Sequence, residues 1–484
     1  MDLLRAPADR EHVPGGHSAI SQSQVLAGLS YALDLTEGQR PGHSVRSCLI
    51  GMRLADELRL PANQRASLFF ALLMKDLGCS SNAARFAALF GNHDQDIKTD
   101  LKHIDWSRAV ESFRFVLRNA SPGAFLLTRT WRLLAIMARG PEGAREVVRT
   151  RCERGAEIAS MLGLPDESVQ AIRALDEHWD GLGQPYAKRG EEIPMHARIM
   201  NLAQTVEVFC SAHGVDVACE VAATRRGRWF APDVVDALFS FRADTSFWDA
   251  LNRDDVLRQV AGIAPADQFL RVDDDRLDLF ATAFARVIDA KSPWTYLHSN
   301  GVADVSVAIA RRLGMDEPNV RLLRRAALLH DIGKLGVSNL ILDKPGKLTD
   351  DEFRAMRSHT GHSLQILSRV PCFAELASEA AGHHERLDGR GYHRGLSARD
   401  LFISTRILAV ADICDALRSS RPYRAGLPTE RVLEIIDRES GTALDPVVVN
   451  ALHTVLESAD AGLAQTLPAA RVVSALEEDY GQAA

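Results

Sequence analysis

Seven histidine and aspartate side chains in the second half of the chain are of the types that bind divalent metal ions. They are His298, His330, Asp331, His359, His383, His384 and Asp412. All lie at or near the ends of predicted helices, where helical bundles project ligands into a shared core pocket. One such histidine alone is more often a core residue satisfied by its neighbours. The ordered set instead predicts a metal centre, and imidazole with carboxylate favours iron or manganese.

The segments that must position these residues are predicted helices. Apolar residues at Val320, Leu323 and Ala327 recur at helical spacing, which places His330 on the same buried face. The stretch ISTRILAVADICDALRSS predicts another helix of this kind, which carries Asp412. Because strand-like alternation between turns is absent, the sequence predicts an all-α bundle.

Two further side chains share faces with the candidate ligands. Lys334 follows Asp331 by three residues, about one helical turn, so its ammonium can reach the same pocket. Asp415 follows Asp412 at the same spacing, which suits an orienting or substrate-side group.

The chain contains an internal repeat. GHSVRSCLIGMRLADELRLP near the N-terminus matches LHSNGVADVSVAIARRLGMD at a constant offset of 255 residues, which pairs His43 with His298 and Lys75 with His330. Later segments match at an offset of 208, which pairs Gln204 with Asp412. The drop in offset predicts an insertion in the first copy, between Asp76 and Asp176.

The first copy lacks most of the candidate ligands. Lys75 replaces the first histidine of the His-Asp pair, Leu175-Asp176 replaces the histidine pair, and Gln204 replaces the last aspartate. The two remaining residues, His43 and Asp76, cannot hold a two-metal centre, so this copy is expected to be structural or regulatory.

Composition excludes several classes of function. The chain has 484 residues, a formal net charge of −7 and no long basic stripe, so duplex nucleic acid is not expected as a ligand. No apolar run is long enough for a membrane span and no signal core begins the chain, which predicts a cytoplasmic protein without membrane partners. Seven cysteines without a CxxC pair fit reduced thiols.

The second copy resembles the HD-GYP domain, a subgroup of the HD phosphohydrolases that degrades cyclic dinucleotides. The resemblance covers about residues 290–457 and rests on HDIGKLGVSNLILDKPGKLTDDEFRAMRSH, HHERLDGRGYHRGL and ADICDALRSSRPYR, in the family's order. It implies that the seven candidates are metal ligands, that Asp331 bridges two ions and that Lys334 reaches toward the scissile phosphate. Arg421 and Arg424 would grip phosphate, and Tyr392 and Asp415 would lie on the substrate side.

The resemblance also implies an activity. Two metal ions about 3.5–4 Å apart lower the pKa of a bridging water and clamp the phosphoryl oxygens. We therefore expect a metal-dependent phosphodiesterase that opens cyclic di-GMP or 3′,3′-cyclic GMP-AMP to a linear dinucleotide through a di-metal-activated hydroxide. Two alternatives remain open, which are a cyclic-dinucleotide sensor or scaffold without turnover and an HD phosphohydrolase acting on mononucleotides.

The sequence departs from the family pattern at three places. The Gly-Tyr-Pro motif reads Gly391-Tyr392-His393, so its loop lacks the fixed φ of proline. Trp294 replaces the glutamate that holds a third metal in some members, which favours two divalent ions. Ser363 replaces a usual glycine, which we expect to be a packing detail.

Together these patterns predict two tandem HD-like helical bundles. Residues 1–245 form the degenerate domain, 246–289 a helical connector, and 290–484 the catalytic HD-GYP domain. The degenerate domain is expected to pack against the catalytic one as a pseudo-dimer partner, and to supply the surface for any homodimer or protein partner.

Overall fold

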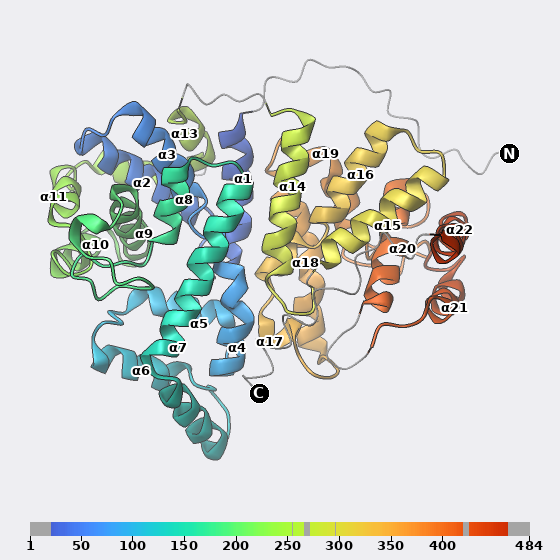
Figure 1. Cartoon of the computed structure of the whole chain (residues 1–484), viewed down its shortest axis with the longest axis horizontal. Helices are drawn as coiled ribbons and strands as arrows, with labels where there is room; N and C mark the ends of the chain where they lie inside the picture. The colour runs from blue at the N-terminus through green and yellow to red at the C-terminus, as the bar shows by residue number, and fades with distance from the viewer. Residues whose placement is uncertain (1–20, 254, 266–271, 296, 420–424, 463–484) are drawn as a thin grey trace.

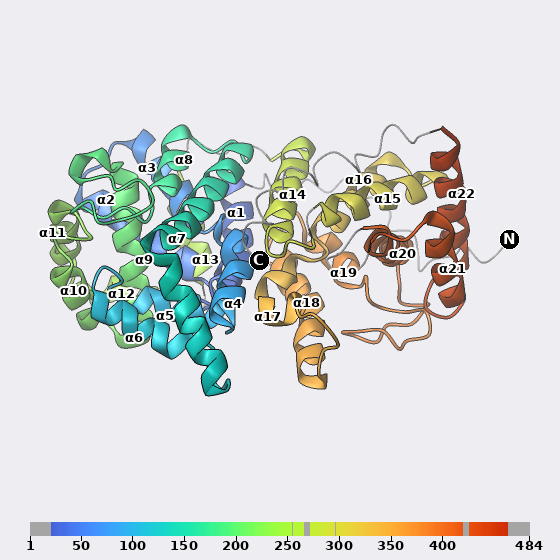
Figure 2. The same cartoon turned by 60° about the horizontal axis from the view of Figure 1, so that its bottom comes forward.

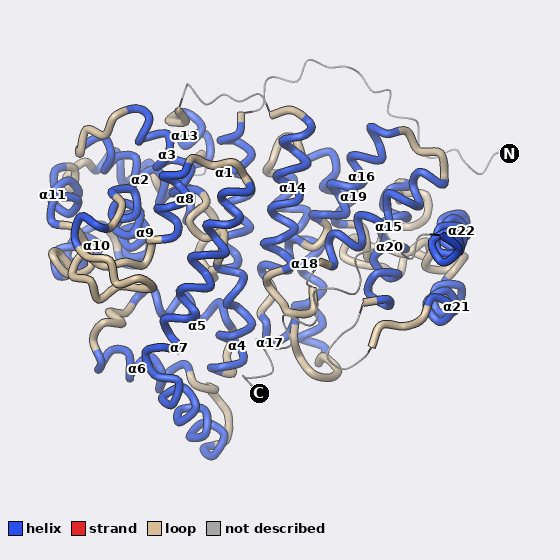
Figure 3. Tube along the Cα trace, in the orientation of Figure 1, coloured by secondary structure: helices blue, strands red, loops and turns tan. Residues whose placement is uncertain are grey.

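The computed structural model describes residues 21–253, 255–265, 272–295, 297–419 and 425–462. Within these ranges the secondary structure is helical, and the only β-type pairings are isolated bridges such as Asp388 with Ser397 (Figure 3). The predicted all-α fold is therefore confirmed. None of the described helices combines the length and apolar character that a membrane span needs.

The first half of the chain forms the left-hand bundle in Figure 1. Its helices are α1 (Gln22–Thr36), α2 (His43–Glu57), α3 (Ala62–Leu73), η1 (Cys79–Asn82), α4 (Ala83–Phe90), α5 (Asp94–His103), α6 (Ala109–Asn119), α7 (Leu126–Met161), α8 (Asp166–Arg173), η2 (Gly190–Glu192), α9 (Met195–His213), α10 (Val215–Thr224), α11 (Pro232–Ser240), α12 (Thr245–Ala250) and α13 (Val256–Gly262).

The second half forms the right-hand bundle. Its helices are α14 (Asp274–Asp289), α15 (His298–Arg312), α16 (Glu317–Leu329), η4 (Ile332–Gly336), α17 (Asn339–Leu342), α18 (Asp350–Ser368), α19 (Ala374–Ala381), α20 (Ile403–Arg418), α21 (Thr429–Glu439) and α22 (Pro446–Gly462).

Local sequence signals fix the starts of the site-bearing helices. Helix α18 begins with a capping box, in which the Thr349 side chain accepts from the Glu352 amide and the Glu352 side chain accepts from the Thr349 amide. Helix α16 is capped by Asp316, whose side chain accepts from the Asn319 amide, and carries a proline in its first turn. These caps satisfy amide groups that a helix start otherwise leaves unpaired.

The sequence repeat is a structural repeat. Asp34 at the end of α1 accepts from the amide and hydroxyl of Ser44, and Asp289 at the end of α14 accepts from the amide and hydroxyl of Ser299, 255 residues later. Helix α14 packs on α15 and α16 as α1 packs on α2 and α3. We therefore propose that the second bundle begins with α14, which the sequence placed in the connector.

The two bundles share an interface and one continuous core. Helix α1 contacts α18 and η4, and α14 contacts α7, along the seam visible between the bundles in Figures 1 and 2. A buried ion pair crosses this seam, because Lys291 Nζ lies 2.7 Å from Asp94 Oδ2. The other oxygen of Asp94 accepts from the Asn339 amide at 2.9 Å. The first bundle thus supports the segments that lead into the candidate site.

Candidate metal centre

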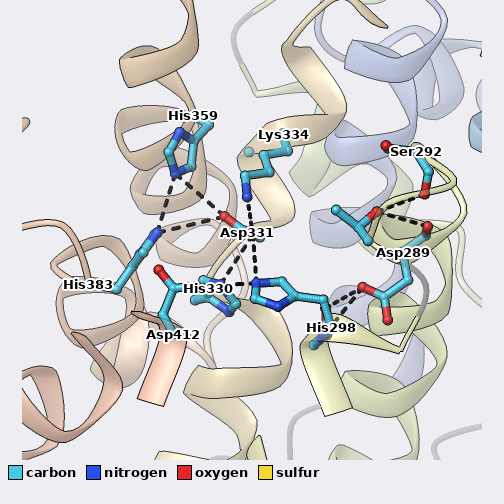
Figure 4. Close-up of polar contacts among 12 residues, drawn as sticks. Asp289, Ser292, His298, His330, Asp331, Lys334, His359, His383 and Asp412 are labelled. Carbon is cyan, nitrogen blue, oxygen red and sulfur yellow. Dashed lines mark hydrogen bonds and ion pairs between the residues drawn. The ribbon is translucent and has the colours of Figure 1, made fainter. Parts of the chain in front are cut away.

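The seven predicted ligands converge on one point inside the second bundle, and Figure 4 labels all of them except His384. Helix α15 begins with His298, α16 ends just before His330, and Asp331 begins the turn of η4. His359 lies within α18, the pair His383–His384 follows α19, and Asp412 lies within α20. Six of the seven residues are buried and His384 is half-buried.

The ligand atoms form two clusters. His298 Nε2 lies 3.2 Å from Asp412 Oδ1, and His330 Nε2 lies 3.9 Å from the same oxygen. On the other side, His359 Nε2 lies 3.3 Å from His383 Nε2, and His384 offers a further ligand atom within 4.8 Å of these two. Each cluster thus offers three ligand atoms at a spacing that suits one metal ion.

Asp331 lies between the clusters and turns one oxygen to each. Its Oδ2 is 3.2 Å from His330 Nε2 and 3.8 Å from His298 Nε2. Its Oδ1 is 3.5 Å from His359 Nε2 and 3.7 Å from His383 Nε2. A carboxylate placed in this way can bridge two ions.

Two of these atoms are buried without a hydrogen bond of ordinary geometry, namely His330 Nε2 and Asp331 Oδ1. Leaving buried polar atoms unsatisfied costs about 1–3 kcal/mol each. Since both atoms point into the ligand cluster, a divalent cation is the partner that their chemistry fits.

Backbone carbonyls set the orientation of three histidines. The Nδ1 atoms of His330, His359 and His383 each lie 2.7 Å from the carbonyl oxygen three residues earlier. Because a carbonyl oxygen only accepts, each Nδ1 carries the proton and each Nε2 presents a lone pair to the cluster.

The electrostatics favour neutral imidazoles at His359 and His383, on one side of the ligand set. Burial lowers the pKa of His359 to about 3 and holds that of His383 well below its usual value. Burial opposes the charge of Asp331, but His330 and Lys334 outweigh it and keep the pKa of the carboxyl well below its usual range. Burial also opposes charge on His298, yet Asp412 and Asp415 raise its pKa to about 10, so this point favours a positive charge.

Asp415 lies behind the first cluster. Its Oδ2 accepts from His298 Nδ1 at 2.6 Å, which directs His298 Nε2 toward Asp412. The fit is close, because a Cβ added at Gly301 would lie 2.0 Å from Asp415 Oδ1. This contact agrees with an orienting role for Asp415.

Lys334 and Tyr392 lie at the edge of the ligand set. Lys334 Nζ is 2.5 Å from Asp331 Oδ2 and is partly exposed. The Tyr392 ring packs against the His384 ring, with 4.8 Å between the ring centroids. The Arg357 guanidinium lies over the Tyr392 ring, 4.4 Å from its centroid. Arg421 and Arg424 lie outside the described residues.

Sequence reasoning did not single out two anchoring carboxylates. The first is Asp289, which binds Ser299. The second is Glu385, which holds the loop after the histidine pair because it accepts from the Arg394 and Leu396 amides at 2.8 and 2.9 Å. Glu177 does the same in the first bundle for Tyr186 and Lys188. Glu177 and Glu385 are 208 residues apart, so the repeat offset pairs these two carboxylates and could have identified them.

Ser363 has a defined position rather than a general packing role. Its hydroxyl donates to the His330 carbonyl at 2.7 Å and accepts from the Gly333 amide at 2.9 Å. Gly333 is itself required, since an added Cβ would lie 1.9 Å from the His359 carbonyl oxygen. Ser363 therefore braces the turn that presents His330 and Asp331.

The corresponding point of the first bundle holds cations of the protein itself. Lys75 is buried, pairs with Asp76 and places Nζ 3.0 Å from His43 Nε2. Arg151 pairs with Asp176, which stands where the second bundle has His384. Glu207 binds the Nδ1 of His43, as Asp415 binds that of His298.

Comparisons with known proteins agree with this geometry. A model of the family described as "HD domain" matches residues 142–222 and 282–448. The chain is 41% identical to 3′3′-cGAMP-specific phosphodiesterase 3 of Vibrio cholerae, over 90% of this chain and 94% of the relative. It is 45% identical to a cyclic di-GMP phosphodiesterase of Thermotoga maritima, over 32% of this chain and 43% of the relative. A crystal structure of the V. cholerae cyclic GMP-AMP specific phosphodiesterase V-cGAP3 aligns with a TM-score of 0.63 at 38% identity, covering 90% and 98% of the two chains.

The helical bundle and its buried histidine–aspartate centre define a metal-dependent phosphohydrolase of the HD type. The chain belongs to the HD domain family. Within that family it is an HD-GYP phosphodiesterase that carries a degenerate HD-like repeat in its N-terminal half, as the sequence predicted.

Proposed function

We propose that this protein hydrolyses a cyclic dinucleotide to a linear dinucleotide, with 3′,3′-cyclic GMP-AMP preferred over cyclic di-GMP. The observation that carries the proposal is the position of Asp331, with one oxygen toward each of two histidine clusters. The preference rests on a relative that matches almost the full chain and whose name specifies 3′3′-cGAMP.

In the proposed site, His298, His330 and Asp412 would hold one divalent ion. His359, His383 and His384 would hold a second, and Asp331, with one oxygen toward each cluster, would serve both. Iron or manganese suits this mixture of imidazole and carboxylate. When bound, the ions neutralise phosphate charge and activate water for attack on phosphorus.

Side chains at the edge of the site would act on the substrate. Lys334 Nζ can exchange its contact with Asp331 for a phosphoryl oxygen or the leaving ribose oxygen, and so stabilise the charge that develops there. Burial raises the pKa of Tyr392, so its hydroxyl stays protonated and can donate a hydrogen bond. Attack by water breaks one P–O bond, and the proton passes to the ribose oxygen that leaves.

The test is a substrate panel with the full-length, metal-loaded protein. We expect 3′,3′-cyclic GMP-AMP to give a linear dinucleotide faster than cyclic di-GMP, with products separated by chromatography and metal content measured on the same sample. Chelation should abolish turnover. Tight binding of cyclic dinucleotides without product would support a sensor, and hydrolysis confined to mononucleotides would support the other alternative.

A further inference from the structure

An exposed apolar surface covers the first part of α7, where the α6–α7 hairpin projects from the first bundle (Figures 1 and 2). Its side chains are between 60% and 88% exposed and are named here the α7 apolar face: Phe125, Leu126, Leu127, Trp131, Leu134 and Met137. The hairpin lies in the segment that the second bundle lacks. Soluble monomers rarely expose contiguous apolar patches of this kind without a partner.

This part of α7 has the reverse of the usual polarity, because its large apolar side chains face solvent and its arginines face the protein. Leu127, Trp131 and Leu134 follow one another at four- and three-residue steps and so form one outward stripe. The two arginines of the same turns point inward, where Arg129 donates to the Leu117 carbonyl and Arg132 to the Ala88 carbonyl. The charged groups thus brace the hairpin, and the apolar ones face solvent.

The inner side of the hairpin has its own small core. Phe90, Ile97 and Phe115 are buried there, and Ile136 of α7 packs against them. Gly140, with a non-helical φ of 56°, makes a kink that separates the projecting segment from the rest of α7. The outward stripe is therefore not needed for packing within the hairpin.

We propose that the α7 apolar face is a homodimer interface, in which the same stripe from a second copy of this chain packs antiparallel across a two-fold axis. Stripes at four- and three-residue steps are the pattern by which paired helices interdigitate. Within the stripe, Thr130, Ala135 and Ala138 are uncharged, so two copies can meet without opposing like charges at the centre.

The available area suits a stable dimer. Aromatic side chains bury about 150–250 Å² each, so Phe125 and Trp131, 88% and 73% exposed, present on the order of 300 Å² between them, and the four aliphatic side chains of the face extend this area. Each partner contributes about 800 Å² to an interface of standard size, so the face supplies a large part of one. Val110 and Phe113 of α6, both more than half exposed, would add to the edge.

The experiment measures the mass of the full-length protein in solution by light scattering after size exclusion, over a range of concentrations. The wild type should have twice the chain mass of 53.1 kDa. The double variant Trp131→Glu/Leu134→Glu should be monomeric, with unchanged circular dichroism, because both side chains are exposed. Val447→Glu is the matched control, since Val447 is 50% exposed on α22, and it should remain dimeric.

Three results would overturn the proposal. A wild type that is monomeric at every concentration would exclude the dimer. A dimer that persists in the double variant would place the interface elsewhere. Flotation of monomeric wild type, but not of the double variant, with phosphatidylglycerol vesicles would assign the face to an anionic membrane. Phosphodiesterase activity does not enter these readouts, so failure of the proposed function leaves this test intact.

Discussion

The two bundles hold equivalent clusters of buried charged groups that balance their charge in different ways. Both anchor the first histidine through a carboxylate on Nδ1, Asp415 in the second bundle and Glu207 in the first. Both place an aspartate at the next position, Asp331 or Asp76. The scaffold was kept in both copies, and the difference lies in what faces the aspartate.

In the first bundle the aspartate faces cations of the chain. Burial opposes the charge of Asp76, but Lys75 and then Lys102 outweigh it and lower its pKa to about 2. In the second bundle, buried Nε2 and carboxylate atoms converge without enough protein cations to satisfy them. The negative charge of the aspartate is thus balanced by a lysine of the chain in the first bundle. In the second bundle the unsatisfied atoms leave room for metal ions, which would give that site its chemistry.

The largest expected effect is the loss of activity on Asp331→Asn. Removing the bridging charge should reduce turnover by at least about 10³-fold, or roughly 4 kcal/mol of transition-state stabilisation. Metal content, measured by mass spectrometry of the elements, should fall in parallel. The matched variant Asp76→Asn should leave metal content at the wild-type level, and a loss of metal there would mean that the first cluster also binds an ion.

The next effect concerns the stability of the first bundle. Lys75→Met removes the cation beside a buried aspartate and should destabilise the protein by about 3–5 kcal/mol, since an unpaired charge remains in the core. Thermal and chemical unfolding would measure it. The double variant Lys75→Met/Asp76→Asn should recover part of that loss. Equal losses in the single and double variants would contradict an ion-pair role for Lys75.

Much of this contrast could be predicted from the sequence. The repeat offsets identified Lys75, Leu175 and Gln204 as replacements for candidate ligands, and the positions of the histidines at or near the ends of predicted helices predicted that they converge. These are properties of helix periodicity and of residue type, which a single sequence contains.

Other features depend on the packing of distant segments. The contact of Lys75 with His43, the pairing of Arg151 with Asp176 and the seam pair of Asp94 with Lys291 join residues that no local pattern connects. The assignment of α14 to the second bundle, which we propose, also rests on such packing, because its acidic start reads as a linker whereas its apolar face packs on α15 and α16.

A smaller effect is expected from the anchoring carboxylates. Asp415→Asn keeps the size of the side chain but weakens the charged hydrogen bond that orients His298. Such partners of metal ligands typically affect affinity or activity by about 10–100-fold. Metal titration and turnover would measure the loss. Glu207→Gln, the equivalent change in the first bundle, should leave metal affinity unchanged, and similar losses in both variants would point to a general effect on folding.

The smallest effect is expected at the departure from the family's Gly-Tyr-Pro motif. His393 is exposed, and its Cδ2 would lie 3.8 Å from a Cβ added at Gly361 of α18. The loop is held instead by Glu385, through the amides of Arg394 and Leu396. His393→Pro should therefore change turnover by no more than about twofold, the scale of a few tenths of a kcal/mol. His393→Ala separates loss of the ring from the introduction of proline. If both variants lose activity and shift the pH–rate profile between about pH 5 and 8, while metal content is preserved, then the His393 imidazole takes part in the reaction.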